Sequence, residues 1–317
     1  MDFSNNVDAI WTTFCSTLPL DLQREARTLA LGMGLVPLPD IPWSRIFKNE
    51  VTLGAPALFA TAMPQATRQM AATATTAHML AVIDAFATDR MLDRQAEGSP
   101  QMLRLLEHIR AERDRAICEL AGKDASPYQD AEYIAICAIN TERLLLQRGM
   151  ALSFSDYSNL SLAKQAVAFP ASLALARAAG CDSRCERAIE GVLRGIVLGL
   201  QFHDDVVDWE DDWKKDGAWA VSLSRGQGSA PLDGKPDLES LRRQVHQSGV
   251  LATMMTMARR RYREANRLAA MLGACWLSDW AREQETIVAE LAEKESKSAG
   301  YVVRAHQLSN WAMEVLG

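Results

Sequence analysis

Apolar residues recur along nearly the whole chain at the three- and four-residue spacings of amphipathic helices, and the alternating pattern of a strand is almost absent. The intervening stretches are rich in Ala, Leu, Met, Arg and Glu, which favour helix. Clusters of Gly, Pro and Ser interrupt this pattern at residues 35–42, 97–100, 122–127, 180–183 and 224–236. No shift in composition divides the chain. We therefore predict one all-α domain of about ten helices over residues 1–317, with residues 1–57 as its least clearly patterned helical part.

Composition narrows the classes of function. Hydrophobic residues make up 48% of the chain, enough for a large core, and the formal net charge is −6. An acidic chain is poorly suited to nucleic acid, whose phosphates need a basic surface. No apolar run reaches the length of a membrane-spanning helix, the first residues lack the order of a secretion signal, and the six cysteines are scattered. We therefore expect a cytoplasmic protein with reduced cysteines, no integral membrane segment and no nucleic-acid partner.

The densest chemistry lies in residues 198–219, where an apolar helix runs into an acidic cluster. Asp204, Asp208 and Asp212 are four residues apart, and each such step along a helix advances about 6 Å and turns about 40°. These three carboxylates form one row, here called the carboxylate row, to which we expect Asp211 to add. Such a row repels itself unless a cation neutralises it, and Mg²⁺ prefers carboxylate oxygens. The alternative is a solvated acidic helix end, as in most charge runs.

A second carboxylate pair, Asp89 and Asp93, ends another apolar helix. Each acidic end continues an apolar face of its own helix, whereas Asp84 projects to the opposite side and is expected to be structural. The faces below Asp89 and Asp204 include His78, Val82, Phe86, Val197 and Gln201. Both acidic ends precede loops rich in helix breakers, so both can lie at one open end of a bundle. We interpret the faces as pocket walls, and the alternative is ordinary helix–helix core.

Two further patterns accompany the carboxylate row. Residues 224–237 are rich in Gly, Ser and Pro and follow the row, so they form either a mobile lid or an ordinary surface linker. Gly191, Gly195 and Gly199 project opposite to the aspartates of the same helix, which predicts a closely packed neighbouring helix.

These features indicate a reaction class. Carboxylates that hold divalent metal at a pocket mouth bind a diphosphate and stabilise it as a leaving group. Lys214 and Lys215 add positive charge suited to phosphate. An apolar interior would hold a hydrocarbon chain and shield a carbocation from water.

The stretch QFHDDVVD, from Gln201 to Asp208, resembles the second aspartate-rich motif of the trans-isoprenyl diphosphate synthase family, in which glutamine precedes DDxxD. The stretch DRMLD, from Asp89 to Asp93, resembles the first DDxxD motif, with Arg90 in place of the second aspartate. The separation of the two motifs also fits the family. This resemblance implies a single all-α bundle of the isoprenoid synthase type around a central apolar cavity.

The resemblance extends over about residues 58–224 and includes Tyr157 to Lys164, which is similar to the family's lysine-bearing helix. It implies a prenyl diphosphate substrate and Mg²⁺, of which we expect three ions. The expected metal ligands are Asp89, Asp93, Asp204, Asp208 and Asp212, and the first four form the expected catalytic set. The expected diphosphate contacts are Lys164, Lys214, Lys215, Arg143 and Arg148.

Departures from the family favour cyclisation over chain elongation. Chain-elongating members carry a GGKR-like N-terminal segment and paired arginines after the first motif, which hold a second diphosphate. Residues 37–51 instead read PLPDIPWSRIFKNEV, and Arg94 is the one arginine directly after Asp93. The carboxylate row also resembles, in its register, the metal triad of class I terpene cyclases.

Two arginines bear on this interpretation. Arg90 should weaken metal binding at the first motif unless it points sideways, which its offset of about 100° from Asp89 allows.

Arg261 and Tyr262 resemble an arginine–tyrosine pair of some cyclases. They lie within RRRYREANR, however, for which a solvated basic helix face is the favoured interpretation.

We predict a homodimeric class I terpene synthase, a carbon–oxygen lyase that ionises a linear C15–C25 prenyl diphosphate with Mg²⁺ and cyclises the carbocation. One alternative is a chain-elongating trans-prenyl diphosphate synthase, or its head-to-head variant, for which we find no reductive cofactor motif. The other is a non-catalytic regulatory subunit of such an enzyme, which the altered first motif suggests.

Overall fold

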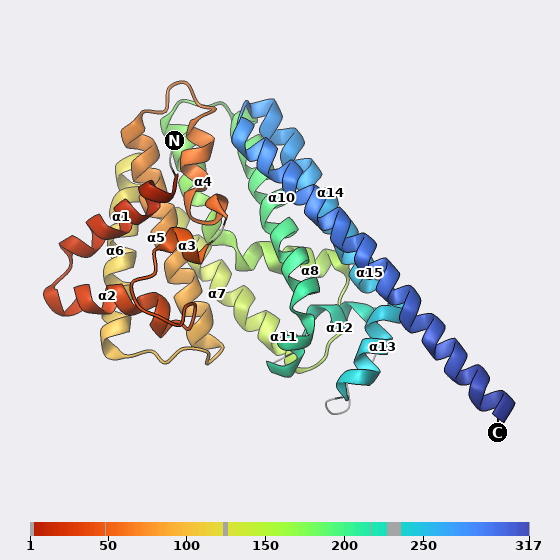
Figure 1. Cartoon of the computed structure of the whole chain (residues 1–317). Helices are drawn as coiled ribbons and strands as arrows, with labels where there is room; N and C mark the ends of the chain where they lie inside the picture. The colour runs from red at the N-terminus through yellow and green to blue at the C-terminus, as the bar shows by residue number, and fades with distance from the viewer. Residues whose placement is uncertain (1–2, 48, 123–125, 216, 227–235, 317) are drawn as a thin grey trace. The chain divides into compact units, whose positions relative to one another are not determined.

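The computed structural model describes residues 3–316 except residues 48, 123–125, 216 and 227–235 (Figure 1). All regular structure in these residues is helical, with fifteen α-helices and one 3₁₀ helix, η1 (Ala166–Ala168). The all-α prediction is confirmed, although short helices raise the number above the predicted ten. The α-helices are α1 (Phe3–Thr17), α2 (Leu20–Gly32), α3 (Trp43–Ile46), α4 (Glu50–Ala60), α5 (Arg68–Leu92), α6 (Pro100–Ala121), α7 (Ser126–Gln147), α8 (Phe154–Lys164), α9 (Pro170–Ala178), α10 (Ser183–Val207), α11 (Trp209–Lys215), α12 (Trp219–Ser224), α13 (Leu238–Ser248), α14 (Val250–Leu272) and α15 (Cys275–Leu316).

The chain divides into two compact units, each built from several segments. Unit 1 contains Met1–Ala135, Ala166–Glu190 and Ala269–Leu277, and unit 2 contains Ile136–Gln165, Gly191–Leu268 and Ser278–Gly317. The helices α7, α10, α14 and α15 contribute residues to both units. That the units form one domain stays a prediction.

Breakers separate the helices where the sequence predicts them. Segment 35–42 lies between α2 and α3, and segments 97–100 and 180–183 each end on the first residue of the next helix, Pro100 of α6 and Ser183 of α10. Of segment 122–127, residues 123–125 lie outside the described part of the chain, and Ser126 begins α7. Within the segment 224–237, Ser224 ends α12 and Asp237 caps α13 by accepting a hydrogen bond from the Ser240 N–H at 2.9 Å. Residues 227–235 lie outside the described part of the chain, so the choice between lid and linker stays open.

Unit 1 is built around α5, which packs against α4, α6 and α9 (Figure 1). Its central residues are almost completely buried, as for Leu80 and Ile83 against Leu105 and Ile109 of α6. By length and composition α5 could cross a membrane, which corrects the expectation that no apolar run is long enough. Because 72% of its most apolar window is buried, α5 has the surroundings of a core helix. The absence of an integral membrane segment stays a prediction.

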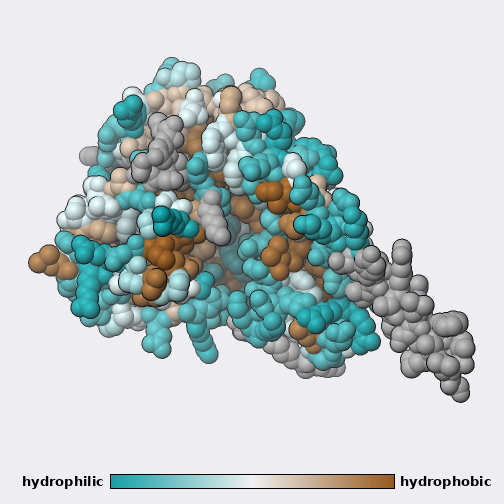
Figure 2. Space-filling model, in the orientation of Figure 1, coloured by the Kyte–Doolittle hydropathy of each residue, from teal (hydrophilic) through white to brown (hydrophobic). Residues whose placement is uncertain are grey.

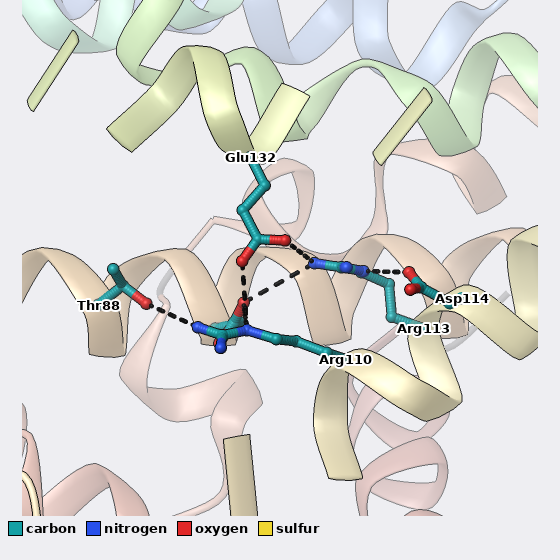
Figure 3. Close-up of polar contacts among 6 residues, drawn as sticks. Thr88, Arg110, Arg113, Asp114 and Glu132 are labelled. Atoms are coloured by element: carbon teal, nitrogen blue, oxygen red, sulfur yellow. Dashed lines mark hydrogen bonds and ion pairs between the residues drawn. The ribbon is translucent and has the colours of Figure 1, made fainter. Parts of the chain in front are cut away.

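Asp84 lies in a buried ion-pair cluster of unit 1, in agreement with the structural role predicted for it. Its Oδ2 accepts a hydrogen bond from Arg110 Nε at 2.9 Å and lies 3.7 Å from Arg113 Nη1. Glu132 of α7 lies between the same two arginines, 3.2 Å from each (Figure 3). Asp114 accepts from Arg113 Nε at 2.9 Å. Burial raises the pKa of Asp84, while the arginines oppose that shift, so the cluster ties α5, α6 and α7 together by mutual neutralisation.

In unit 2, α14 packs closely on α10 along the predicted glycine face. A Cβ atom added at Gly195 would lie 2.8 Å from the Arg261 carbonyl oxygen, and one at Gly199 would lie 2.7 Å from the Tyr262 ring. Glycine at these positions permits an approach that any side chain would prevent. The prediction of a close neighbouring helix is confirmed.

Figure 2 shows hydrophilic side chains over most of the visible face, with smaller hydrophobic patches between them. The six cysteines are free, and Cys137 and Cys275 are exposed.

Candidate functional site

The carboxylate row lies in unit 2, across the junction of α10 and α11. The sequence predicts one helix here, but α10 ends at Val207 and α11 begins at Trp209. The helical register continues through the junction, because the Asp208 N–H donates to the Asp204 carbonyl at 2.9 Å and the Asp212 N–H to the Asp208 carbonyl at 3.0 Å. The three aspartates therefore keep their four-residue helical spacing.

The carboxyl groups of the row influence one another's pKa. Desolvation raises the pKa of Asp204 and of Asp212, and the negative charge of Asp208 raises both further. A divalent cation relieves such repulsion, and carboxylate oxygens suit Mg²⁺. Within the described residues, however, no group of three His, Cys, Asp or Glu side chains is arranged to hold a metal ion. The donor chemistry fits Mg²⁺, provided that further oxygens, such as those of a diphosphate, complete the coordination.

Asp211 does not join the row, contrary to the prediction. Its side chain is 70% exposed and pairs with Lys214 Nζ at 2.6 Å, which lowers the pKa of Asp211. Lys215 Nζ instead lies 3.8 Å from Asp212, and its charge opposes the desolvation that raises the Asp212 pKa. Lys215 therefore pairs with the row, and Lys214 pairs with Asp211.

Behind the row, Asp205 is buried and held by two side chains. The Tyr157 hydroxyl donates to Oδ2, and Gln201 Nε2 donates to Oδ1 at 2.9 Å. Burial raises the pKa of Asp205 to about 7, and the hydrogen bond from Tyr157 opposes that rise. Gln201 was predicted to contact substrate; in this structure its amide supports Asp205, and the substrate contact stays a prediction.

Lys164, at the end of α8, is held by a residue that the sequence interpretation missed. Its Nζ lies 2.5 Å from Glu142 Oε2, and Trp219 Nε1 donates to Glu142 Oε1 at 2.7 Å. The Lys164 charge also opposes the rise in the pKa of Asp204 and Asp212, so Lys164 lies within electrostatic reach of the row. No spacing rule signals Glu142 or Trp219, because they meet across 77 residues of chain.

Tyr262 corrects a second interpretation. The solvated basic face predicted for RRRYREANR holds for Arg259 and Arg263, which are exposed, but Tyr262 is fully buried. Burial raises the pKa of Tyr262, and the charge of Asp204 raises it further. Its hydroxyl has no hydrogen-bond partner among the described residues.

The first motif lies in unit 1, at the end of α5. Asp89 belongs to the last turn and Asp93 is the C-cap, so both lie at the negative end of the helix dipole, where a cation is stabilising. Arg90 turns sideways, as expected, and its Nη2 donates to the Gly34 carbonyl at 3.4 Å. Metal binding by Asp89 and Asp93 stays a prediction.

The apolar face below Asp89 belongs to the core of unit 1. Val82 is buried in the cluster around Leu80, and Phe86 packs at its edge against Phe47. His78 is buried, and its Nε2 donates to the Thr52 carbonyl at 3.0 Å. These contacts are those of the helix–helix alternative, and pocket lining by this face stays a prediction.

The remaining predicted residues are placed as follows. Val197 is half-buried on α10, within unit 2. Arg143 is half-buried beside Glu142 on α7, and Arg148 is exposed just beyond the end of that helix. Contact of these residues with substrate stays a prediction.

Comparison with known proteins finds similar structures but no similar sequences. No protein-family model matches the sequence, and no curated protein matches it. A polyprenyl synthetase from Streptomyces coelicolor A3(2) superposes with a TM-score of 0.67 at 14% identity, over 92% of this chain and 97% of that chain. A geranylgeranyl pyrophosphate synthase from Lactobacillus brevis gives 0.64 at 13% identity, over 89% and 95%.

A third solved structure, a decaprenyl diphosphate synthase from Rhodobacter capsulatus, gives a TM-score of 0.58 at 14% identity, over 87% of this chain and 98% of that chain. Identities this low show the fold alone. The resemblance inferred from the two aspartate-rich motifs is confirmed at that level, and the chain has the all-α fold of the isoprenoid synthases.

Proposed function

We propose that the chain is a class I terpene synthase that binds a linear C15–C25 prenyl diphosphate, ionises it and cyclises the resulting carbocation. The observation that carries this proposal is the carboxylate row, whose three carboxyl groups keep one register and repel one another. Lys164 and Tyr262 both lie within electrostatic reach of it. A metal–diphosphate complex needs carboxylates, a cation and a hydrogen-bond donor of this kind.

Each group has a distinct task in this proposal. The row would hold Mg²⁺, which when bound would stabilise the negative charge of the leaving diphosphate. Lys164 and Lys215 would neutralise diphosphate oxygens, and the Tyr262 hydroxyl would donate to one of them. Breaking the bond between C1 and oxygen sends the electron pair to the diphosphate and leaves an allylic cation, which a double bond of the same chain then attacks. Asp89 and Asp93 remain the expected second set of metal ligands.

The second candidate is chain elongation, which the shared fold of three prenyl synthases favours. Chain elongation needs basic residues that hold a second diphosphate. Residues 37–51 lack the GGKR-like segment, and only Arg94 directly follows the first motif, which argues against elongation. The cytoplasmic location and the homodimer stay predictions in either case.

The test is a product analysis. Purified protein with Mg²⁺ and farnesyl, geranylgeranyl or geranylfarnesyl diphosphate is expected to release a hydrocarbon or terpene alcohol detectable by gas chromatography and mass spectrometry. Asp204→Asn is expected to remove nearly all product, whereas Asp211→Asn, which alters an exposed pair with Lys214, is the matched control and should retain it.

Three other outcomes would overturn the proposal. Longer diphosphates formed only after addition of isopentenyl diphosphate would establish elongation instead. Diphosphate binding without turnover, together with a stable hetero-complex, would indicate a regulatory subunit. Equal activity of Asp204→Asn and wild type would exclude the row as the site.

A further inference from the structure

Unit 1 contains a cavity of about 390 Å³ that the proposed function does not use. It lies where α1 packs on α2 and α3 (Figure 1), and its lining residues fall between Asp8 and Trp43, all within the described part of the chain. The volume is within the range of small-molecule sites, about 300–1,000 Å³. The carboxylate row belongs to unit 2 and contributes nothing to this lining.

One part of the cavity lining is aromatic and held in place by a carboxylate. Trp43 is 3% exposed, and its ring meets the half-buried Trp11 edge to face, with 5.3 Å between the ring centroids. Asp8 ties α3 to α1, because its Oδ1 accepts the Ser44 N–H at 3.2 Å and its Oδ2 accepts the Ser44 hydroxyl at 2.6 Å. The two indoles therefore form a preformed apolar surface against which the ring of a ligand can pack.

Another part of the lining brings two opposite charges next to each other. The Asp40 N–H donates to the Arg27 carbonyl at 3.5 Å, so the two residues are neighbours. Both side chains are exposed and line the cavity. Neither forms an ion pair, with the other or with any further residue that the structure describes. A carboxylate and a guanidinium are thus both available to a ligand.

We propose that this cavity binds a free aromatic α-amino acid. The α-carbon of such a ligand carries an ammonium and a carboxylate side by side, which suit Asp40 and Arg27 respectively. Its ring packs on the indole of Trp11 and the edge of Trp43. The inference goes beyond the proposed function and does not depend on it, because none of these residues belongs to the carboxylate row.

The charges of the lining favour a zwitterion over a simple cation or anion. A ligand with only an ammonium would leave the Arg27 guanidinium without a partner and place a second positive charge beside it. A ligand with only a carboxylate would do the same to Asp40. Asp8 already accepts two hydrogen bonds from Ser44, so it does not require a cation of its own.

The experiment is a calorimetric titration of the full chain with four probes. L-phenylalanine carries the ammonium, the carboxylate and the ring, and it is expected to bind with a dissociation constant of about 1 mM or lower. Phenethylamine lacks the carboxylate, phenylpropionate lacks the ammonium and glycine lacks the ring. Each of these three is expected to bind at least about tenfold more weakly, because it loses one charged hydrogen bond or the aromatic contact.

Variants assign each part of the ligand to its residue. Arg27→Gln is expected to weaken L-phenylalanine binding about tenfold without weakening that of phenethylamine. Asp40→Asn is expected to weaken L-phenylalanine binding to a similar extent without weakening that of phenylpropionate. Asparagine tolerates the left-handed φ of 59° at position 40, so this variant keeps the backbone. The matched control is Arg24→Gln on α2, since Arg24 is exposed but does not line the cavity.

Trp11→Leu removes the aromatic surface and should weaken L-phenylalanine binding while leaving glycine binding unchanged. Circular dichroism checks that each variant folds. Should Trp11→Leu not fold, the comparison of L-phenylalanine with glycine on the wild-type chain still tests the ring contact.

Four results would overturn the inference. Wild-type protein that shows no saturable binding of L-phenylalanine up to about 10 mM would exclude the site. Phenethylamine or phenylpropionate binding as tightly as L-phenylalanine would make the ligand a simple cation or anion. Glycine binding as tightly would exclude the ring contact. Arg27→Gln and Asp40→Asn both equal to wild type would place the ligand outside this cavity.

Discussion

The ring of Tyr262 occupies the space that a side chain at Gly199 would need, with two ring carbons 2.7 Å from the position of an added Cβ. The same face of α10 meets α14 at Gly195, where the nearest atom is the Arg261 carbonyl oxygen at 2.8 Å. At Gly191 the nearest atom is Leu268 Cδ1, the end of a flexible side chain, at 2.6 Å. The three glycines therefore differ in what an added methyl group would have to displace.

Gly195→Ala is expected to lower the free energy of unfolding by about 1–3 kcal/mol, since a backbone oxygen moves only if the helix moves. Gly191→Ala should cost less, because Leu268 can change rotamer. Urea denaturation followed by circular dichroism measures both. A larger loss for Gly191→Ala than for Gly195→Ala would contradict the packing described for α10 and α14.

Tyr262→Phe separates a structural tyrosine from one that binds substrate. The hydroxyl is buried and has no hydrogen-bond partner among the described residues, so its removal should leave the stability unchanged or slightly raised. If the hydroxyl donates to the diphosphate, kcat/KM should fall about tenfold, the effect of one lost hydrogen bond to a charged group. Steady-state kinetics and thermal denaturation give the two values. An unchanged kcat/KM at unchanged stability would remove Tyr262 from the site.

The spacing of residues along the chain correctly predicted the helices and the glycine face on which α10 packs against α14. The glycines of α10 are repeated along one helix, so their common direction follows from helix geometry alone. The spacing of the carboxylate row likewise survived the junction of α10 and α11, because the hydrogen bonds between Asp204, Asp208 and Asp212 remain helical. Both results depend on residues close together in the chain.

The errors arose where a partner decides the environment of a side chain. Tyr262 is surrounded in sequence by arginines, yet its side chain is buried because its ring packs on Gly199 of another helix. Asp211 was assigned to the row, but the pair with Lys214 draws it to solvent. Glu142 had no signal at all, since its partners Lys164 and Trp219 come from two other helices. Contacts of this kind are set by tertiary packing, which the spacing of residues along one helix does not encode.

Arg113→Met tests the ion-pair cluster of unit 1. Arg113 is 2% exposed and pairs with Asp114, Glu132 and Asp84, so its loss leaves buried carboxylates with less compensation. We expect the free energy of unfolding to fall by about 3–5 kcal/mol. Arg104→Met is the matched control: its pair with Asp21 is about half exposed, and its loss should cost less than about 1 kcal/mol. Similar losses for both variants would mean that the buried cluster contributes no more than a surface pair.

His78 predicts how stability depends on pH. Burial lowers the pKa of His78 from 6.5 to about 4, while its hydrogen bond to the Thr52 carbonyl opposes that shift. Below pH 6.5 the unfolded chain takes up a proton that the folded chain does not, so this stability is present above pH 6.5 and is lost as the pH falls towards 4. The full loss amounts to about 3 kcal/mol.

His78→Gln keeps an N–H donor for the Thr52 carbonyl but does not titrate, and it should flatten the dependence of stability on pH over this range. The free energy of unfolding in urea, measured from pH 7 to pH 4.5, gives the comparison, with His108→Gln, exposed on α6, as the matched control. A slope for His78→Gln as steep as that of wild type would assign the acid sensitivity to other groups.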